Sequence, residues 1–205
     1  VGFDNKIHQD YKHYENRLEK NNITIYALRG NHDDPEYYKN PDKYNYPRLK
    51  FLEDHKIYNI CGREIYIIGG ANSVDITWRM EENQKLAAHG KNKKVWWENE
   101  DIIRIPEENL PKRVDLILSH EAPLTFLPII TRSEELPESQ YQKILDSRKY
   151  LDTILKQIVA DYWFFGHYHE SVTGTYGKLL YKCLNIMEFF EAPEPKLRNI
   201  QGEAE

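Results

Sequence analysis

The sequence predicts an α/β fold. Short apolar, β-branched segments typical of buried strands occupy 23–28 and 114–118, and a third apolar run covers 161–165. Apolar residues recur at helical spacing over 6–20 and 139–159. With 205 residues, the chain has the length of one such domain, since a single domain usually contains about 100–200 residues.

The N-terminal half is expected to begin with an amphipathic helix over 6–20. The strand at 23–28 then leads directly into Gly30-Asn31-His32-Asp33. Residues 35–47 are rich in Tyr, Asn, Asp and Pro, which predicts a long loop. Apolar runs on both sides of Cys61-Gly62-Arg63 predict a β-hairpin that ends at Gly69-Gly70. The segment 75–104 has a mixed pattern, expected to be half helical and half mobile.

The C-terminal half repeats the arrangement of an apolar strand followed by polar residues. The strand at 114–118 precedes Ser119-His120, and the run at 161–165 ends in Gly166-His167-Tyr168-His169. Residues 173–181 are expected to form a closing hairpin around Gly177. We expect one domain over 1–192 and a frayed tail over 193–205.

Composition excludes several classes of protein. The formal net charge of −5 argues against an extended basic surface for duplex nucleic acid or anionic membrane, although a local phosphate pocket remains compatible with it. No apolar stretch approaches the roughly 20 residues of a membrane-spanning helix. Only Cys61 and Cys183 occur, too few for a disulfide framework or a thiolate zinc site, so a cytoplasmic location is expected.

Three polar clusters follow predicted strands and are expected to meet at one edge of the sheet. They are Asn31-His32-Asp33, His120 and His167-Tyr168-His169. Imidazole nitrogen and side-chain amide oxygen are ligands for Zn²⁺, Mn²⁺ or Fe. A His-x-His on an extended chain would point its two rings to opposite faces, so we expect Gly166 to supply the turn that re-aims them.

These residues resemble the calcineurin-like metallophosphoesterase superfamily, whose ordered motifs are D-x-H, G-D-x-x-D, G-N-H-(D/E), H and G-H-x-H. Three of the five are present in order, as GNHD at 30–33, LSHEAP at 118–123 and GHYH at 166–169. The segment GGANSVD at 69–75, with Arg79, Trp96, Trp97 and Glu98, is also similar to a subgroup of small bacterial and phage-type phosphoesterases.

The resemblance implies a four-layer α/β/β/α sandwich with a dinuclear metal centre. Asn31, His120 and His167 would bind one divalent ion and His169 the other, while His32 would face the substrate with Asp33 beside it. The metal identity stays open among Mn²⁺, Fe, Zn²⁺ and Ni²⁺. Two such ions about 3.5–4 Å apart can hold a hydroxide and neutralise the charge that develops on a phosphoryl group.

The first two motifs of the family are absent from the sequence. Val1-Gly2-Phe3 resembles the residues that follow Gly-Asp in the second motif, so we expect residues upstream of Val1 to supply D-x-H and G-D. Asp4, His8, Asp10 and His13 are alternative ligands, but His8 and Asp10 lie off the apolar face of the first helix and are more simply solvated.

The predicted activity is hydrolysis of a phosphomonoester or phosphodiester, with His32 as general acid and Asp33 fixing its tautomer. Arg79 is a candidate phosphate ligand or a surface ion-pair partner, and Tyr37 is a candidate for stacking on a nucleobase or simply for packing the loop. Two alternatives remain open: a catalytically impaired binding or scaffold protein, and a metal-dependent nuclease. Nucleic acid is expected only as a substrate, and the sequence specifies no protein partner.

Overall fold

A computed structural model describes residues 7–91, 93–128 and 136–194, without the side chains of residues 7–10. It confirms the predicted α/β class. The larger of two sheets has the strand order β3-β4-β5-β6-β8-β7 and is parallel from β4 to β8, with an antiparallel strand at each edge. Its strands are β3 (Ile57–Ile60), β4 (Arg63–Ile68), β5 (Leu116–Ser119), β6 (Tyr162–Phe165), β7 (Val172–Tyr176) and β8 (Leu179–Cys183).

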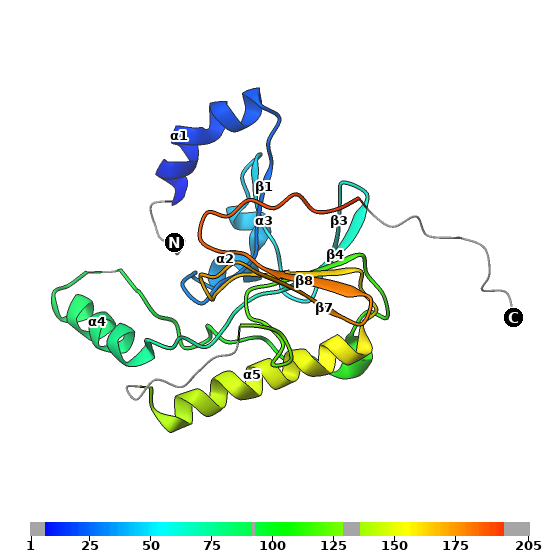
Figure 1. The fold of residues 1–205 in the computed structure, drawn as a ribbon. Coiled ribbons are helices and arrows are strands. Elements are labelled where there is room, and N and C mark those ends of the chain that lie inside the picture. Colours follow the sequence, from blue (N-terminus) through cyan, green and yellow to red (C-terminus); the bar gives the residue numbers. More distant parts are fainter. Residues whose placement is uncertain (1–6, 92, 129–135, 195–205) are drawn as a thin grey trace, which may run out of the picture.

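Helix α5 (Glu138–Gln157) covers one face of this sheet, below the strands in Figure 1. Alternate strand residues point to that face, so the aligned row Tyr66, Ile117, Trp163 and Tyr181 enters the same core as Leu151 of the helix. The periodicity that predicted a helix over 139–159 therefore corresponds to a buried helix face.

The opposite face of the large sheet carries a second core. Ile65, Ile67 and Phe164 pack there against Leu28 and Leu52, which follow the two strands of the smaller sheet. That sheet consists of β1 (Ile25–Ala27) and β2 (Leu49–Phe51) in parallel.

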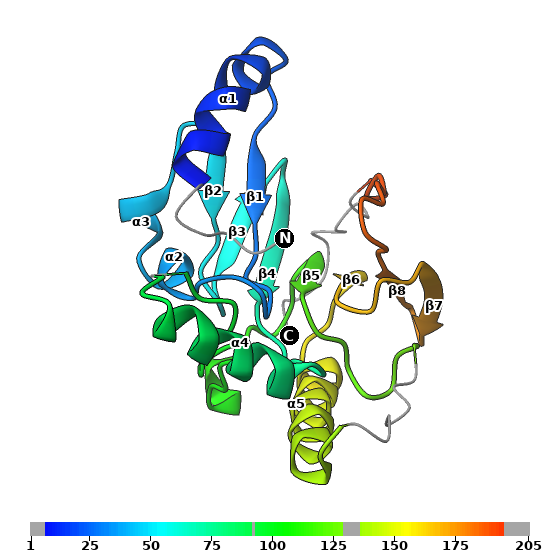
Figure 2. The same cartoon turned by 90° about the vertical axis from the view of Figure 1, so that its left-hand side faces the viewer.

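A third core connects the smaller sheet to helices. Tyr11 of α1 (Ile7–Lys20) packs with Leu49 and Phe51 of β2. The succession of helix α5, large sheet, small sheet and further helices matches the expected α/β/β/α order, with α1 and α5 at opposite ends of the molecule (Figure 2).

Two local predictions in this region are wrong. The segment 23–28 was expected to be a buried strand, but Ile25 and Tyr26 are each 44% exposed and Ile23 is 48% exposed. The reason is that β1 pairs with β2 on one edge only, within the part of the chain described. The expected loop at 35–47 instead contains two short helices, α2 (Glu36–Lys39) and α3 (Pro41–Tyr44).

The remaining elements lie in connections. Helix α4 (Ile76–Ala88) forms the helical half of 75–104, and a 3₁₀ turn covers Glu107–Asn109. Both predicted hairpins, β3–β4 and β7–β8, are present. The expected frayed tail begins at 193, yet the carbonyl of Pro193 accepts a 2.6 Å hydrogen bond from Arg63; residues 195–205 lie outside the described part. No helix among the described residues is long and apolar enough to cross a membrane.

Candidate metal centre

The site begins in the turn that follows β1. Asp33 accepts hydrogen bonds from the backbone nitrogen of Gly30, at 2.7 Å, and from the Tyr38 hydroxyl, at 3.0 Å. A Cβ atom on Gly30 would lie 3.2 Å from Cε1 of His120. The absence of a side chain at Gly30 therefore lets the turn approach His120 closely.

Three of the four predicted metal ligands converge where the two sheets meet. Nε2 of His120 lies 2.9 Å from Oδ1 of Asn31, and the rings of His120 and His167 are 4.9 Å apart between centroids. Asn31 follows a strand of the small sheet, whereas the two histidines follow the adjacent parallel strands β5 and β6. The carboxyl ends of these strands place the predicted ligands together.

Both imidazoles are favoured in their neutral form. Burial lowers the pKa of His120 well below the ordinary histidine value, and the nearby His167 and His32 lower it further. Burial also lowers the pKa of His167, against the opposing effect of Glu121. A neutral imidazole carries a free lone pair, which is the form that binds a metal.

The turn after β6 differs from its predicted form. His167 and His169 themselves adopt left-handed backbone, with φ of +71° and +55°, whereas Gly166 has no positive φ. Such conformations in residues with a Cβ cost of the order of 1–3 kcal/mol and occur at functional sites. The expectation that Gly166 re-aims the rings is wrong, because the two histidines make the turn. His169 is exposed.

Ser73 holds the amide of Asn31 in place. Nδ2 of Asn31 donates to Oγ of Ser73 at 2.9 Å, which leaves Oδ1 directed to His120. Ser73 donates in turn to Oε2 of Glu100 at 2.8 Å, and its backbone nitrogen donates to Oε1 at 2.7 Å. Glu100 is 3% exposed. The sequence pattern did not identify Ser73 or Glu100 as site residues.

Arg79 is a buried member of the same hydrogen-bond network. It is 1% exposed, pairs with Glu100 at 3.2 Å and donates to the backbone oxygen of Asn31 at 3.0 Å. It also donates to Oγ of Ser73 and to the carbonyl of Val95. Arg79 does form an ion pair, but a buried one and not the surface pair expected as one alternative. A phosphate could reach the guanidinium only by displacing these contacts.

Tyr37 occupies the small-sheet core. It is 9% exposed and its ring lies 5.2 Å from that of Phe51 and 4.6 Å from that of Tyr44. The structure thus favours the packing reading over stacking on a nucleobase. Trp96, whose backbone oxygen accepts a hydrogen bond from Asn83, and Trp97 are half-buried in the segment after α4.

His32 stands apart from the buried residues on either side of it. It is exposed, while Asn31 is 3% and Asp33 is 7% exposed. Desolvation lowers the pKa of His32 from its ordinary value, and the positive charge of Arg79 lowers it further. This position leaves the imidazole accessible to a molecule that approaches the Asn31–His120 pair.

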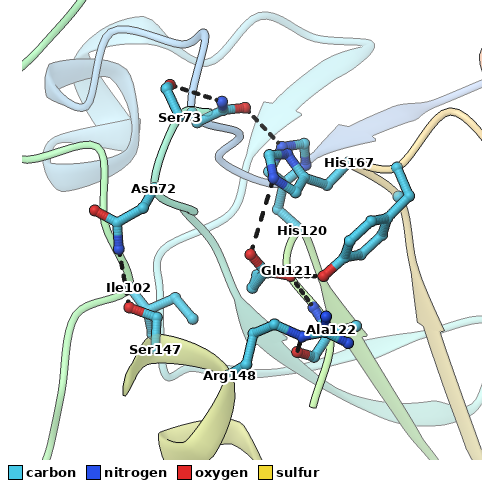
Figure 3. Close-up of polar contacts among 12 residues, drawn as sticks. Asn72, Ser73, Ile102, His120, Glu121, Ala122, Ser147, Arg148 and His167 are labelled. Atoms are coloured by element: carbon cyan, nitrogen blue, oxygen red, sulfur yellow. Dashed lines mark hydrogen bonds and ion pairs between the residues drawn. The ribbon is translucent and has the colours of Figure 1, made fainter. Parts of the chain in front are cut away.

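Glu121 is a site residue that sequence reasoning quoted within LSHEAP but did not single out. It is fully buried, and its Oε2 lies 3.8 Å from Nε2 of His167 (Figure 3). Among the described residues, Oε2 has no hydrogen-bond partner. A charged residue directly after a strand and next to a candidate ligand was the available signal.

The donor set fits a divalent cation of intermediate hardness. It combines one amide oxygen with two neutral imidazoles. Beside them lies a buried carboxylate oxygen that has no hydrogen-bond partner in the part of the chain described. No group of three or more His, Cys, Asp or Glu side chains suited to a metal ion occurs within the described ranges. The described residues therefore offer a partial ligand set centred on Asn31, His120 and His167.

The chain matches a known protein family. The family model described as calcineurin-like phosphoesterase matches residues 3–171, most of the chain and all three clusters of candidate ligands. Comparison with curated proteins gives no match.

Proposed function

The chain belongs to the calcineurin-like phosphoesterase family, whose members are phosphoester hydrolases that generally use divalent metals, and we propose that it hydrolyses a phosphomonoester or phosphodiester at the site around Asn31. The observation that carries the proposal is the convergence of Asn31, His120 and His167 at the carboxyl ends of β1, β5 and β6. The mixed α/β architecture with two sheets is consistent with the family fold.

In this proposal, Asn31, His120 and His167 hold one divalent ion and His169 contributes to a second. Bound divalent ions supply Lewis acidity toward a phosphoryl oxygen and a nucleophile at neutral pH. Ser73 orients the Asn31 amide, and Asp33 braces the turn through Gly30 and Tyr38. These contacts fix the ligand positions before a cation binds, which lowers the cost of assembling the site.

His32 acts as the general acid in the proposed reaction. Its exposed imidazole donates a proton to the departing alkoxide, which leaves poorly as an anion. Although its pKa is lowered in the free protein, an incoming phosphate brings negative charge, which favours the protonated ring. Asp33, adjacent in the turn, is proposed to select the tautomer.

The test is hydrolysis by the purified intact protein supplied with Mn²⁺, measured on a phosphate monoester, a phosphate diester and single-stranded DNA. His120→Ala and His167→Ala should each lose bound metal, read by emission spectroscopy, together with activity, because each removes an imidazole from the same ion. His89→Ala is the matched control, since His89 is exposed at the end of α4 and its Nδ1 contacts the carbonyl of Lys85. Full metal occupancy in either ligand variant would contradict the assignment.

A further inference from the structure

Glu121 lies next to His167. One of its carboxylate oxygens accepts two hydrogen bonds, and the other faces the imidazole. Oε1 accepts a 2.8 Å hydrogen bond from the backbone nitrogen of Ala122 and a second bond from the Tyr168 hydroxyl. Oε2 has no hydrogen-bond partner in the described structure and faces Nε2 of His167 at 3.8 Å (Figure 3). A carboxylate that is fully buried with an orphaned oxygen is costly unless a nearby group compensates it.

The surroundings hold this carboxylate in place. Arg148 is 1% exposed and donates to the carbonyls of Ala122, Pro123 and Phe126, which immobilises the loop that follows Glu121. Its guanidinium also lies 5.4 Å from the centroid of the Tyr168 ring. Glu121 therefore meets His167 from a rigid position.

We infer that Glu121 is a positioning residue that keeps the proton of His167 on Nε2 and so leaves Nδ1 unprotonated for a divalent cation. A negative oxygen at 3.8 Å favours an N–H dipole directed toward it over a lone pair directed toward it. The neutral ring carries one proton, so a proton on Nε2 leaves the lone pair on Nδ1. Carboxylates that orient metal-binding histidines in this way tune affinity in many metalloproteins.

This inference rests on the proposed function, because it assigns His167 to a metal. It makes a specific prediction for Glu121→Gln. The two donors on Oε1 require the amide oxygen of glutamine to stay in that position, so its NH₂ group takes the place of Oε2. That NH₂ group must donate to Nε2 of His167, which moves the ring proton to Nδ1 and blocks the nitrogen assigned to the cation.

The tautomer of His167 tests the inference without metal. In the metal-free full chain labelled with ¹⁵N-histidine, long-range ¹H–¹⁵N correlation at a pH where the ring is neutral should show a protonated Nε2. The signals are assigned by their loss in His167→Asn. A protonated Nδ1 in the wild-type protein would overturn the inference, and this measurement does not depend on whether a Glu121 variant folds.

The Glu121→Gln variant should show a protonated Nδ1 and about 10–100-fold weaker Mn²⁺ binding by calorimetry. Asp115→Asn is the matched control: Asp115 is also a buried carboxylate, located at the opposite end of β5, where it accepts a 2.7 Å bond from the backbone of Glu64. The control should leave both the tautomer and Mn²⁺ affinity unchanged.

The outcomes separate the two proposals. Wild-type protein that binds no Mn²⁺ overturns the proposed metal site. Wild-type protein that binds Mn²⁺, with Glu121→Gln binding it equally well, overturns the role of Glu121 alone. Weaker binding by Glu121→Gln with an unchanged tautomer also overturns that role, because it would show that the carboxylate acts on the cation by another route.

Discussion

His32 is the exposed member of a turn whose flanking side chains are buried, and this contrast accords with the proposed roles of Asn31 as a metal ligand and His32 as a general acid. Asn31 is 3% exposed and donates a hydrogen bond to Ser73, whereas the side chain of His32 is exposed. A buried amide suits a fixed metal ligand, and an exposed imidazole suits proton transfer to a substrate that arrives from solvent.

His32→Ala should therefore leave bound metal unchanged but slow hydrolysis of alkyl phosphoesters by about 10²–10⁴-fold. Nitrophenyl esters should be affected much less, because an acidic phenol leaves without a proton. Measuring kcat for both esters, beside metal content, decides the role of His32. Loss of metal would identify a ligand, and equal slowing of both esters would identify a phosphate-binding group.

In the Arg79–Glu100 pair, each buried charge is compensated by the charge of the other residue. Burial lowers the pKa of Arg79 and raises the pKa of Glu100, so desolvation outweighs the mutual attraction for both groups. Such a pair adds little net stability, but removing one member leaves the other charge buried without compensation.

Glu100→Ala should lower the free energy of unfolding by about 3–5 kcal/mol, measured by urea denaturation. Asp146→Ala is the control, because Asp146 pairs with Lys149 at a similar distance of 3.3 Å while the two side chains are 56% and 57% exposed. That change should cost less than about 1 kcal/mol. Equal losses in the two variants would contradict this account of the buried pair.

At the scale of elements, the loop after β4 passes very close to other backbone segments. Gly70 has φ of +88°, and a Cβ atom there would lie 2.6 Å from Nη2 of Arg29 and from the carbonyl oxygens of Glu100 and Asp101. The backbone nitrogen of Gly70 also donates to the carbonyl of Arg29 at 2.7 Å. This close approach joins the loop after β1 to the loop after β4 and so fixes the position of Asn31 relative to Ser73.

Gly70→Ala should destabilise the fold more than Gly62→Ala does. Gly62 also has positive φ, +74°, but a Cβ there would meet no atom within 4 Å. Gly62→Ala is therefore expected to cost only the backbone term of about 1–2 kcal/mol. The difference between the melting temperatures of the two variants measures the destabilisation caused by the steric clash at Gly70. Similar decreases in both variants would show that the loop after β4 rearranges to avoid the clash.

At the scale of the whole molecule, the two cysteines lie in parts of the large sheet that differ in exposure to solvent. Cys61 is exposed in the turn between β3 and β4, whereas Cys183 is fully buried at the end of β8. Burial raises the pKa of the Cys183 thiol to about 11. Below that value the thiol stays protonated in the folded protein, and only the thiolate is nucleophilic.

Native protein at mildly alkaline pH should thus react with a thiol reagent at Cys61 alone, and Cys183 should react after unfolding. Because folding raises the Cys183 pKa, the stability that its protonated form contributes is lost as the pH rises from the unfolded value of 9.0 toward about 11. Cys61→Ser provides the control and should be unreactive until the sheet opens. Rapid labelling of folded Cys61→Ser would show that β8 is accessible.

Much of the fold was determined by local sequence pattern. The helical spacing of 139–159 predicted α5, the turn residues around Gly62 predicted the β3–β4 hairpin, and polar clusters after apolar runs located Asn31, His120 and His167. These patterns act over a few residues and express the periods of helix and strand. The single-domain organisation stays a prediction, and so do the metal-binding and catalytic roles of all the candidate site residues.

Only the tertiary structure decided which distant residues meet. It paired Arg79 with Glu100, placed Tyr37 in a core, left Ile25 of β1 exposed and brought Glu121 to His167. None of these results follows from periodicity, because a side chain's burial and partners depend on which strands neighbour each other, here β3-β4-β5-β6-β8-β7, and on the two sheets packing together. The sequence by itself determined which candidate ligands follow the strands, whereas the contacts that orient Asn31 depend on residues 42 and 69 positions further along the chain. Ser73 accepts the hydrogen bond from the Asn31 amide, and Glu100 in turn accepts a hydrogen bond from Ser73, because folding brings these segments together in space.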